Sequence, residues 1–445
     1  MKQILKKLWC ALGVGLCVPF FANANGVESY ANLIGAYLRN PSCNTLYSSP
    51  EAVFYNIAGT AFMADGIYVH IGNQLVFKEY TNEANGIKYT DDENQYLFPS
   101  FSAVYKSGKI AFFGSFAVYG GGGSLKYNDG SALTAGILSE ASLSSQSESD
   151  KYTQRASSAS DEAKAQKYTA TAQKYANIAT ALSAAIENHS LDVYSRSFGE
   201  QLGLSFCFNQ YISAAACFRL LQGQQNVKIA CDDSLFVYAN GGSEIGFQAA
   251  GWGYSFVLGV HAKPLEDLDV TVQYQTKSAM QYEYTRVYGE LTEVLGYEKG
   301  SKFHSDFPAV WNLGIGYQLL DELYISANFN AYKESDIELN GSFQDGKYND
   351  SFEVAIGADY QVLDFLLISI GGVFTRTGGT AEVNNIVNPA LNAFSLGTGG
   401  TVKCSKNVSI ELGGLYSYFI EQEYEGVILN KKALNTALAI NIKPF

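Results

Sequence analysis

Apolar and polar residues alternate with a period of two along several stretches of this chain. Phe352, Val354 and Ile356 alternate with small or polar residues, and the segments 323–330 and 268–275 repeat the pattern. Successive side chains of a β-strand point to opposite faces, so these stretches predict strands with one apolar face. Alternation alone leaves open whether that face meets lipid or the core of a soluble sandwich.

Short turns alternate with long polar connections between these stretches, as at Asn209-Gln210 and Leu320-Asp321. This alternation is typical of outer-membrane barrels, which have short turns on one side and longer loops on the other. The pattern predicts an all-β fold, an antiparallel transmembrane barrel of about 14 strands. The strands are expected near residues 67–80, 97–106, 109–119, 198–209, 211–221, 251–262, 268–288, 308–319, 322–333, 351–362, 365–377, 393–404, 407–420 and 432–443.

The composition favours a membrane barrel over a soluble domain. The chain has 31 tyrosines, 27 phenylalanines, 43 glycines and 8 prolines, which suits tilted strands with aromatic girdles. Charged residues make up 16% of the chain, against roughly 25% in ordinary soluble domains. Beyond the N-terminus no stretch is long and apolar enough for a transmembrane helix, so a membrane location requires a closed barrel.

The N-terminus predicts export. Three lysines within the first seven residues precede an apolar run from Leu8 to Phe21, which ends in Ala22-Asn23-Ala24. This is the pattern of a secretory signal peptide over residues 1–24, with cleavage after Ala24. The run is shorter than the roughly 20 apolar residues of a membrane-spanning helix. We expect the mature chain in the bacterial outer membrane.

Charge, cysteines and histidines exclude several classes of function. A formal net charge of −13 argues against a nucleic-acid partner. Cleavage of the signal leaves five cysteines, an odd number at irregular spacing that gives no disulfide framework. The four histidines stand apart from one another, without a metal-binding or catalytic pattern. We therefore expect no metal, no cofactor, no catalytic residues and no enzyme activity.

Two segments depart from the strand pattern. Residues 25–66 are rich in apolar side chains that need burial, which predicts a hatch, or plug, inside the barrel formed by residues 67–445. Residues 137–198 contain neither glycine nor proline, and apolar residues recur there at helical spacing. We expect this insertion to be a helical extracellular loop, which either gates entry or is a variable surface feature. Its serine-rich start, Ser139 to Ser149, is expected to be flexible.

The hatch segment carries a resemblance to a known family. Asn56-Ile57-Ala58-Gly59 resembles the Asn-Pro-Ala-Gly motif of the FadL family of outer-membrane transporters for long-chain fatty acids and other hydrophobic compounds (FadL/TodX-like), with isoleucine in the proline position. Isoleucine restores the backbone donor that proline lacks. Further similar segments follow in order along the chain: Phe98-Pro99-Ser100-Phe101, Gly251-Trp252-Gly253-Tyr254, Tyr274-Gln275-Thr276-Lys277-Ser278, Phe307-Pro308-Ala309, and Gly357 to Arg376.

The resemblance implies a mechanism and a set of site residues. Long-chain fatty acids or other lipophilic ligands are captured by the outer loops, the hatch rearranges, and ligand leaves sideways through the wall at a kinked third strand. No motif assigns a base that would contact a ligand carboxylate. Lys277 and Arg376 lie in predicted strands and are candidates either for this contact or for charges that line the lumen. The resemblance also implies a monomer among outer-membrane lipid and lipopolysaccharide. The residues that match the kinked strand are Phe112, Phe113, Gly114 and Phe116. Gly114 could accommodate the kink and the run from Gly120 to Gly123 could supply mobility beyond it, or this is an ordinary strand with one glycine.

Two other functions remain open for a barrel of this kind. A general diffusion porin explains the strands, but it would keep an open polar lumen without an apolar N-terminal segment. An adhesin-like barrel would act through its long loops, and this role is compatible with transport.

Overall fold

The computed structural model describes residues 34–293, 297–338, 348–379, 389–424 and 426–443. The predicted signal peptide and the first residues of the predicted hatch lie outside the described residues. None of the described helices is long and apolar enough to cross a membrane.

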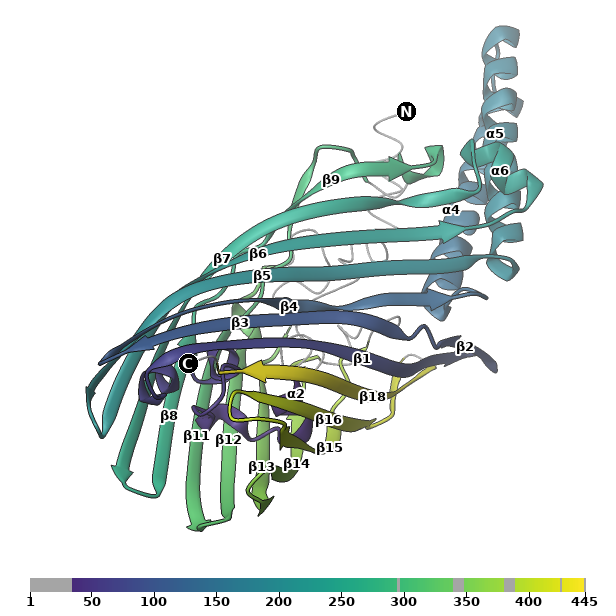
Figure 1. Ribbon diagram of the computed structural model, residues 1–445. Helices are drawn as coiled ribbons and strands as arrows, with labels where there is room; N and C mark the ends of the chain where they lie inside the picture. The colour runs from purple at the N-terminus through teal and green to yellow at the C-terminus, as the bar shows by residue number, and fades with distance from the viewer. Residues whose placement is uncertain (1–33, 294–296, 339–347, 380–388, 425, 444–445) are drawn as a thin grey trace.

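The described chain forms a closed antiparallel β-barrel (Figure 1). The first and last wall strands pair with each other, with Val69 opposite Ile442, so the sheet has no free edge. The predicted fold class is confirmed. The fourteen wall strands are β1 (Gly66–Ala84), β3 (Gln95–Ser107), β4 (Ile110–Tyr127), β5 (Ser190–Asn209), β6 (Ile212–Ala230), β7 (Glu244–Leu265), β8 (Leu268–Gln275), β11 (Ala309–Leu320), β12 (Leu323–Lys333), β13 (Ser351–Leu363), β14 (Leu366–Arg376), β15 (Ala393–Lys403), β16 (Val408–Phe419) and β18 (Val427–Ile442).

Shorter elements extend the barrel at the end that carries the long connections. They add hydrogen-bonded rungs to the neighbouring wall strands or cover the barrel mouth. These are strands β2 (Ile87–Asp91), β9 (Gln281–Tyr288), β10 (Lys302–His304) and β17 (Gln422–Tyr424), helix α6 (Ser234–Asn240), and the 3₁₀ turns η4 (Glu290–Glu293) and η5 (Glu334–Asp336).

The apolar side chains face outward. On β7, Trp252 and Phe256 are 54% and 52% exposed, whereas Ser255 and His261 between the outward positions are fully buried. A soluble sandwich would show the reverse, because its apolar face packs on a core. The exposed apolar face identifies the outer surface as the part of the wall that meets lipid.

The insertion between β4 and β5 forms a helical hairpin that projects beyond the barrel mouth (Figure 1). Its helices are α4 (Ala132–Ser157) and α5 (Glu162–Glu187). Ser131 caps α4 in a capping box, and the Asp161 side chain accepts two backbone N–H bonds at the start of α5. Strand β5 begins at Ser190, so the last residues of the expected insertion belong to the wall.

The serine-rich start of the insertion lies within α4, so the expectation of flexibility there is wrong. The serines form part of the contact between the two helices. Ser142 Oγ donates to the Ala179 carbonyl at 2.7 Å, and Ser149 Oγ donates to the Ala172 carbonyl at 2.9 Å. These bonds satisfy buried hydroxyls and allow two small-residue helices to pack closely.

The segment before β1 lies inside the barrel. It forms short helical turns: α2 (Gly35–Arg39), η2 (Cys43–Thr45), α3 (Ala52–Tyr55) and η3 (Ile57–Phe62). Nearly all of its described side chains are buried. We call residues 34–63 the hatch.

Glycines on the inner wall make room for the hatch. A Cβ added at Gly413 would lie 2.6 Å from the Gly35 carbonyl oxygen, and one at Gly357 would lie 2.2 Å from Asn40 Oδ1. Similar close approaches to hatch atoms occur at Gly314, Gly316, Gly371, Gly397 and Gly399. The hatch therefore packs against backbone, and a side chain at these positions would displace it.

The neighbouring glycines Gly413 and Gly414 provide a matched test of this packing. Gly413→Leu is expected to push the hatch from the wall and raise single-channel conductance in planar bilayers. Gly414→Leu should leave conductance low, because a Cβ at Gly414 has no atom closer than 3.9 Å. Equal conductance in the two variants would contradict the proposed packing role of Gly413.

Candidate functional site

The hatch motif is anchored to the inner wall through its own backbone and side chains. The Asn56 side chain accepts the Gly59 N–H at 3.0 Å and so caps the turn η3. Its amide nitrogen lies 3.1 Å from His261 Nδ1 on β7. Ser213 Oγ on β6 donates to the Ala58 carbonyl at 2.8 Å. All four residues of the motif are buried.

Isoleucine in the proline position of the motif contributes a backbone hydrogen bond in this chain. The Ile57 N–H donates to Gln273 Oε1 on β8 at 3.1 Å, a bond that proline could not make. Position 59 favours glycine for a steric reason, because a Cβ there would lie 2.5 Å from Asn56 Nδ2. The departure from the family motif therefore adds one hydrogen bond between hatch and wall.

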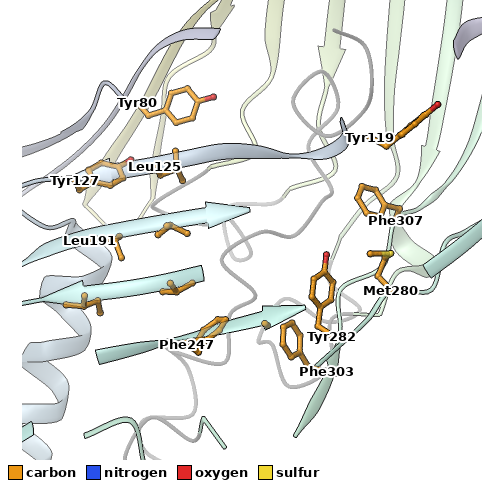
Figure 2. Packing of buried hydrophobic residues seen from close by; sticks show 14 of the residues in the cluster. Tyr80, Tyr119, Leu125, Tyr127, Leu191, Phe247, Met280, Tyr282, Phe303 and Phe307 are labelled. Atoms are coloured by element: carbon orange, nitrogen blue, oxygen red, sulfur yellow. The ribbon is translucent and has the colours of Figure 1, made fainter. Parts of the chain in front are cut away.

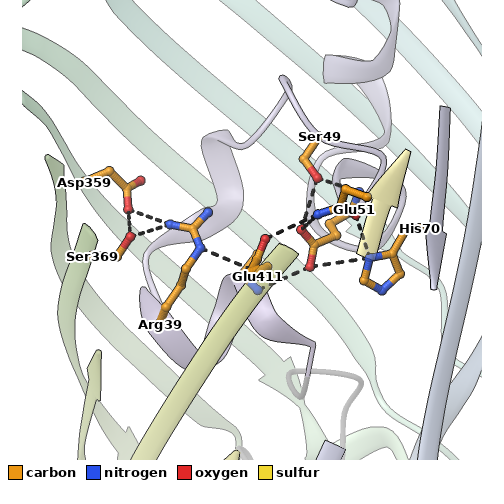
Figure 3. A network of polar contacts seen from close by, with 9 residues as sticks. Arg39, Ser49, Glu51, His70, Asp359, Ser369 and Glu411 are labelled. Atoms are coloured by element: carbon orange, nitrogen blue, oxygen red, sulfur yellow. Dashed lines mark hydrogen bonds and ion pairs between the residues drawn. The ribbon is translucent and has the colours of Figure 1, made fainter. Parts of the chain in front are cut away.

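A buried polar network joins the start of the hatch to the opposite part of the wall (Figure 3). Arg39 of the hatch donates to Glu411 on β16 at 3.2 Å and to Asp359 on β13 at 2.8 Å. The Arg39 side chain is 8% exposed and that of Glu411 is 2% exposed. One guanidinium therefore balances two carboxylates from separate strands, and we call these three residues the hatch latch.

A carboxylate of the hatch itself, that of Glu51, enters the same network. Glu51 Oε1 lies 3.8 Å from His70 Nδ1 on β1, and both side chains are fully buried. Asn441 Nδ2 on β18 donates to Glu51 at 3.2 Å and to Glu411 at 3.4 Å. Groups from β1, β16 and β18 thus hold the hatch at several points.

Aromatic and aliphatic side chains fill the barrel interior toward the long-connection end (Figure 2). Tyr282 stacks on Phe303 with ring centroids 5.3 Å apart, and Phe247 packs against Tyr297 at 4.6 Å. This cluster continues to Tyr119 on β4. The interior above the hatch therefore contains a continuous apolar cluster, whereas the lumen of a porin is polar and filled with water.

A small cavity lies between the hatch and the wall, beside the contact of the hatch with this aromatic cluster. It has a volume of about 40 Å³ and is lined by Phe54 and Tyr55 of the hatch and by Tyr119, Arg219 and other wall residues. An apolar cavity of about 150 Å³ binds benzene. The described cavity is too small for such a ligand, so binding requires the hatch or the aromatic side chains to move.

Arg219 on β6 is the residue of this cavity that the sequence interpretation missed. Its guanidinium lies 4.1 Å above the Tyr119 ring, and it donates to Gln201 Oε1 at 3.1 Å and also to Gln275. Arg219 is 5% exposed, and no carboxylate pairs with it among the described residues. Buried charges normally have an opposite charge beside them, so this cation is available to an anionic ligand.

The two predicted carboxylate contacts lie elsewhere. Arg376 is exposed and stacks over Phe352 at 5.8 Å, on the outward-facing row of β14. Its side chain cannot reach the interior, so this candidate is wrong. Lys277 follows β8, and its ammonium pairs with Asp306 at 3.0 Å and with Glu338 at 3.5 Å. Because its charge is already balanced by these carboxylates, Lys277 is a weaker candidate for contacting a ligand carboxylate.

Asp306 and Glu338 lie close to His304, one of the histidines that stand apart from one another in the sequence. The three side chains form a group that could hold a metal ion. The group is the cluster His304, Asp306 and Glu338 found in the described part of the chain. Lys277 occupies the space between the carboxylates, and a bound ammonium competes directly with a cation. The five cysteines Cys43, Cys207, Cys217, Cys231 and Cys404 are free thiols.

The predicted third strand, β4, is irregular, but not at Gly114. Gly114 pairs regularly with Ala103 on β3 and Leu202 on β5. The register shifts lie further along, between Val118 and Gly123. Phe112 and Phe116 face outward from the regular part of the strand, and Phe113 faces inward.

Beside this irregular stretch the pairing between β3 and β4 stops. Ser100 opposite Ala117 is the last rung between them, and Asp91 opposite Tyr127, between β2 and β4, is the next. Residues 95–99 and 118–126 face each other across this interval without ladder bonds in the described wall. We call this interval the wall seam.

Comparison with known proteins agrees with this geometry. Residues 200–437 match the sequence profile of the outer membrane protein transport protein family (OMPP1/FadL/TodX). The chain belongs to this family. Members of this family are outer-membrane transport proteins, and the closed barrel with its lipid-facing surface agrees with an outer-membrane location of this chain.

Individual members of this family and its structural relatives are distant in sequence. A 47 kDa outer membrane protein of Pasteurella multocida is 26% identical over 166 residues, which span 34% of this chain and 38% of that protein. The Pseudomonas putida toluene transporter TodX superimposes with a TM-score of 0.62 at 14% identity, over 94% of this chain and 99% of TodX. A Pseudomonas aeruginosa FadL homologue gives a TM-score of 0.61 at 15% identity, over 94% and 98%.

Proposed function

We propose that this protein takes up small hydrophobic compounds that carry an acidic group, of which long-chain fatty acids are the simplest class. Ligand enters among the long connections, crosses the aromatic interior and binds beside Arg219. The hatch then rearranges, and ligand leaves sideways through the wall seam into the membrane. The observation that carries this proposal is the buried Arg219, which pairs with no carboxylate in the part of the chain that the structure describes.

The two parts of the site suit the two parts of such a ligand. An apolar chain gains about 0.8 kcal/mol for each methylene that leaves water, and the aromatic cluster supplies that environment. A guanidinium binds a carboxylate through paired N–H donors. Since the family includes a toluene transporter, a hydrocarbon without an acidic group is the alternative ligand, and it would not need Arg219.

A porin function fits these features less well. The hatch occupies the lumen, and the cavity beside Arg219 holds about 40 Å³. A general diffusion pore needs a continuous aqueous path. An adhesin-like function would depend on the helical hairpin and would not explain the buried Arg219.

Uptake by cells tests the proposal. The full chain is expressed in a host that lacks its own transporter for hydrophobic compounds, and entry of radiolabelled oleate, toluene and glucose is measured. Faster entry of oleate than in cells with an empty vector, without faster glucose entry, is expected. Faster glucose entry alone would indicate a porin, and no change with any probe would leave the adhesin-like function.

A further inference from the structure

A group of buried, uncharged polar side chains lies on the inner wall between Arg219 and the barrel mouth. Gln225 follows Arg219 in the inward row of β6, and neither its amide nitrogen nor its amide oxygen has a hydrogen-bond partner among the described residues. The hydroxyls of Ser197 on β5 and Tyr282 on β9 lack partners in the same way. All three residues are at most 2% exposed. We call Gln225, Ser197 and Tyr282 the polar patch.

Two glycines bring the members of the polar patch together. Tyr282 lies opposite Gly251 on β7, which in turn lies opposite Gly223 on β6. A Cβ at Gly251 would be 2.7 Å from Tyr282 Cγ, and one at Gly223 would be 2.0 Å from the Tyr282 hydroxyl oxygen. The ring therefore lies along the inner wall across both glycines, where a side chain would displace it. Its hydroxyl comes close to Ser197 and Gln225 without hydrogen-bonding geometry.

Other buried hydroxyls of the inner wall have partners. Ser205 Oγ lies 2.7 Å from Thr60 Oγ1 of the hatch, and Ser395 Oγ lies 2.7 Å from Ser417 Oγ. A buried donor or acceptor that is left without a partner destabilises a fold, so such groups are rare. Several of them side by side indicate a place where a ligand supplies the missing hydrogen bonds.

The chemistry of the polar patch suits an uncharged group of the ligand. An amide offers both donors and an acceptor, and each hydroxyl can donate or accept. A ligand hydroxyl also donates and accepts, so it can bond to Gln225 and to one of the two hydroxyls at the same time. The patch borders the aromatic cluster, since Tyr282 stacks on Phe303 (Figure 2). The rest of such a ligand would therefore remain in apolar surroundings.

The spacing between the polar patch and Arg219 sets the length of the ligand. Gly223, beside the Tyr282 hydroxyl, and Gln225 follow Arg219 by four and six residues on the same strand. At about 3.3 Å per residue, the patch lies roughly 13–20 Å from Arg219 along the wall. With C–C bonds of about 1.5 Å, an extended chain of roughly 10 to 16 carbons covers this distance. Leu221, between the two sites, is buried and apolar.

We propose that Gln225, Ser197 and Tyr282 form a second ligand subsite, which binds a hydroxyl in the middle or distal part of a long-chain fatty acid. The inference rests on the proposed function, in which Arg219 binds the acidic group. It names the substrate class more narrowly as hydroxylated long-chain fatty acids. Side chains of the aromatic cluster move aside to admit the acyl chain between the two subsites.

A matched pair of ligands tests this subsite. Ricinoleate (12-hydroxyoleate) differs from oleate only by one hydroxyl far from the carboxylate. Binding of each to the purified full chain is measured by displacement of a fluorescent fatty acid. Ricinoleate is expected to bind about tenfold more tightly, because its hydroxyl bonds to groups that are otherwise buried without partners. The isomer 2-hydroxyoleate carries its hydroxyl beside the carboxylate and should bind no more tightly than oleate.

Neighbouring glutamines on β6 provide a matched pair of variants. Gln225→Leu removes the amide from the polar patch and should lower the preference for ricinoleate to about threefold or less, with oleate binding retained. Gln224→Leu makes the same change at the next residue, which is exposed on the other face of the strand, and should keep the tenfold preference. Tyr282→Phe removes only a hydroxyl and leaves the ring to stack on Phe303, so it should also lower the preference. Migration of unheated protein on detergent gels shows that each barrel remains folded.

The outcomes separate this subsite from the proposed function. Equal binding of ricinoleate and oleate to the unmodified protein would overturn the subsite and leave the binding of acidic ligands standing. A tenfold preference that persists in both Gln225→Leu and Tyr282→Phe would also overturn it, because the hydroxyl would then be bound elsewhere. Binding of neither fatty acid would overturn the subsite together with the proposed function.

Discussion

Replacing Arg39 with methionine is expected to free one end of the hatch and convert a closed barrel into one that conducts ions. The substitution leaves the carboxylates of Glu411 and Asp359 facing a buried space without their cation. Breaking a buried ion pair by removing one partner typically costs about 3–5 kcal/mol. That is comparable with the whole stability of many small domains, so displacement of the hatch is the expected relief.

Single-channel recording in planar bilayers measures this effect. The unmodified protein should show low conductance, and Arg39→Met should show larger and frequent openings. The triple variant Arg39→Met, Asp359→Asn, Glu411→Gln serves as control, because it removes the unpaired charges together with the cation. It should close again, since replacing all members of a buried ionic cluster is often neutral. Low conductance in Arg39→Met would show that the latch does not hold the hatch.

The barrel could be predicted because each wall strand has lipid on one side and a filled interior on the other. That environment imposes alternation, which is visible around Phe352 and Val354. The predicted strands are too short where the environment of the strand changes. Strand β6 was expected to end near 221 but continues to Ala230, through a polar stretch that begins Gln222-Gly223-Gln224. Beyond Leu221 the outward residues of β6 are polar, whereas Val227 and Ile229 face inward. The lipid-facing alternation therefore ends although the strand continues.

The site was less predictable, because its key contacts join residues far apart in sequence. The partners of Lys277 lie beyond the next strand, at Asp306 and Glu338, and nothing near Lys277 indicates them. The irregularity of β4 depends on its pairing with neighbouring strands, and the register shifts lie between Val118 and Gly123 rather than at Gly114. Arg376 could have been excluded, since it shares the outward row of Ile370 and Phe374 on the same strand.

Arg219 also left a signal in the sequence. It is a lone charge in a strand whose other residues from Ile212 to Leu221 are small or apolar. Charges within membrane-spanning segments are costly and generally mark functional positions. The strand alone could not tell which face carries it, because both faces are small or apolar there. The structure gives the missing information by placing Arg219 beside Gln201, Gln275 and the cavity.

Arg219→Met is expected to abolish uptake of oleate while sparing that of toluene. Methionine keeps much of the apolar volume but removes the guanidinium. Truncating one partner of a buried, hydrogen-bonded charge pair costs about 2–5 kcal/mol. Since each 1.4 kcal/mol is a factor of ten in affinity, oleate binding to the purified protein should weaken at least about 30-fold. Toluene has no charged group and should enter at an unchanged rate.

Two control variants separate ligand recognition from a general defect. Arg376→Met makes the same chemical change on the outer surface and should leave oleate uptake intact. Arg219→Lys retains the charge without the planar fork and should keep part of the binding. A parallel loss of oleate and toluene uptake in Arg219→Met would assign Arg219 to interior packing around Tyr119. Undiminished oleate uptake would mean that the acidic group is bound elsewhere, and the buried cation would then serve only to order Gln201 and Gln275.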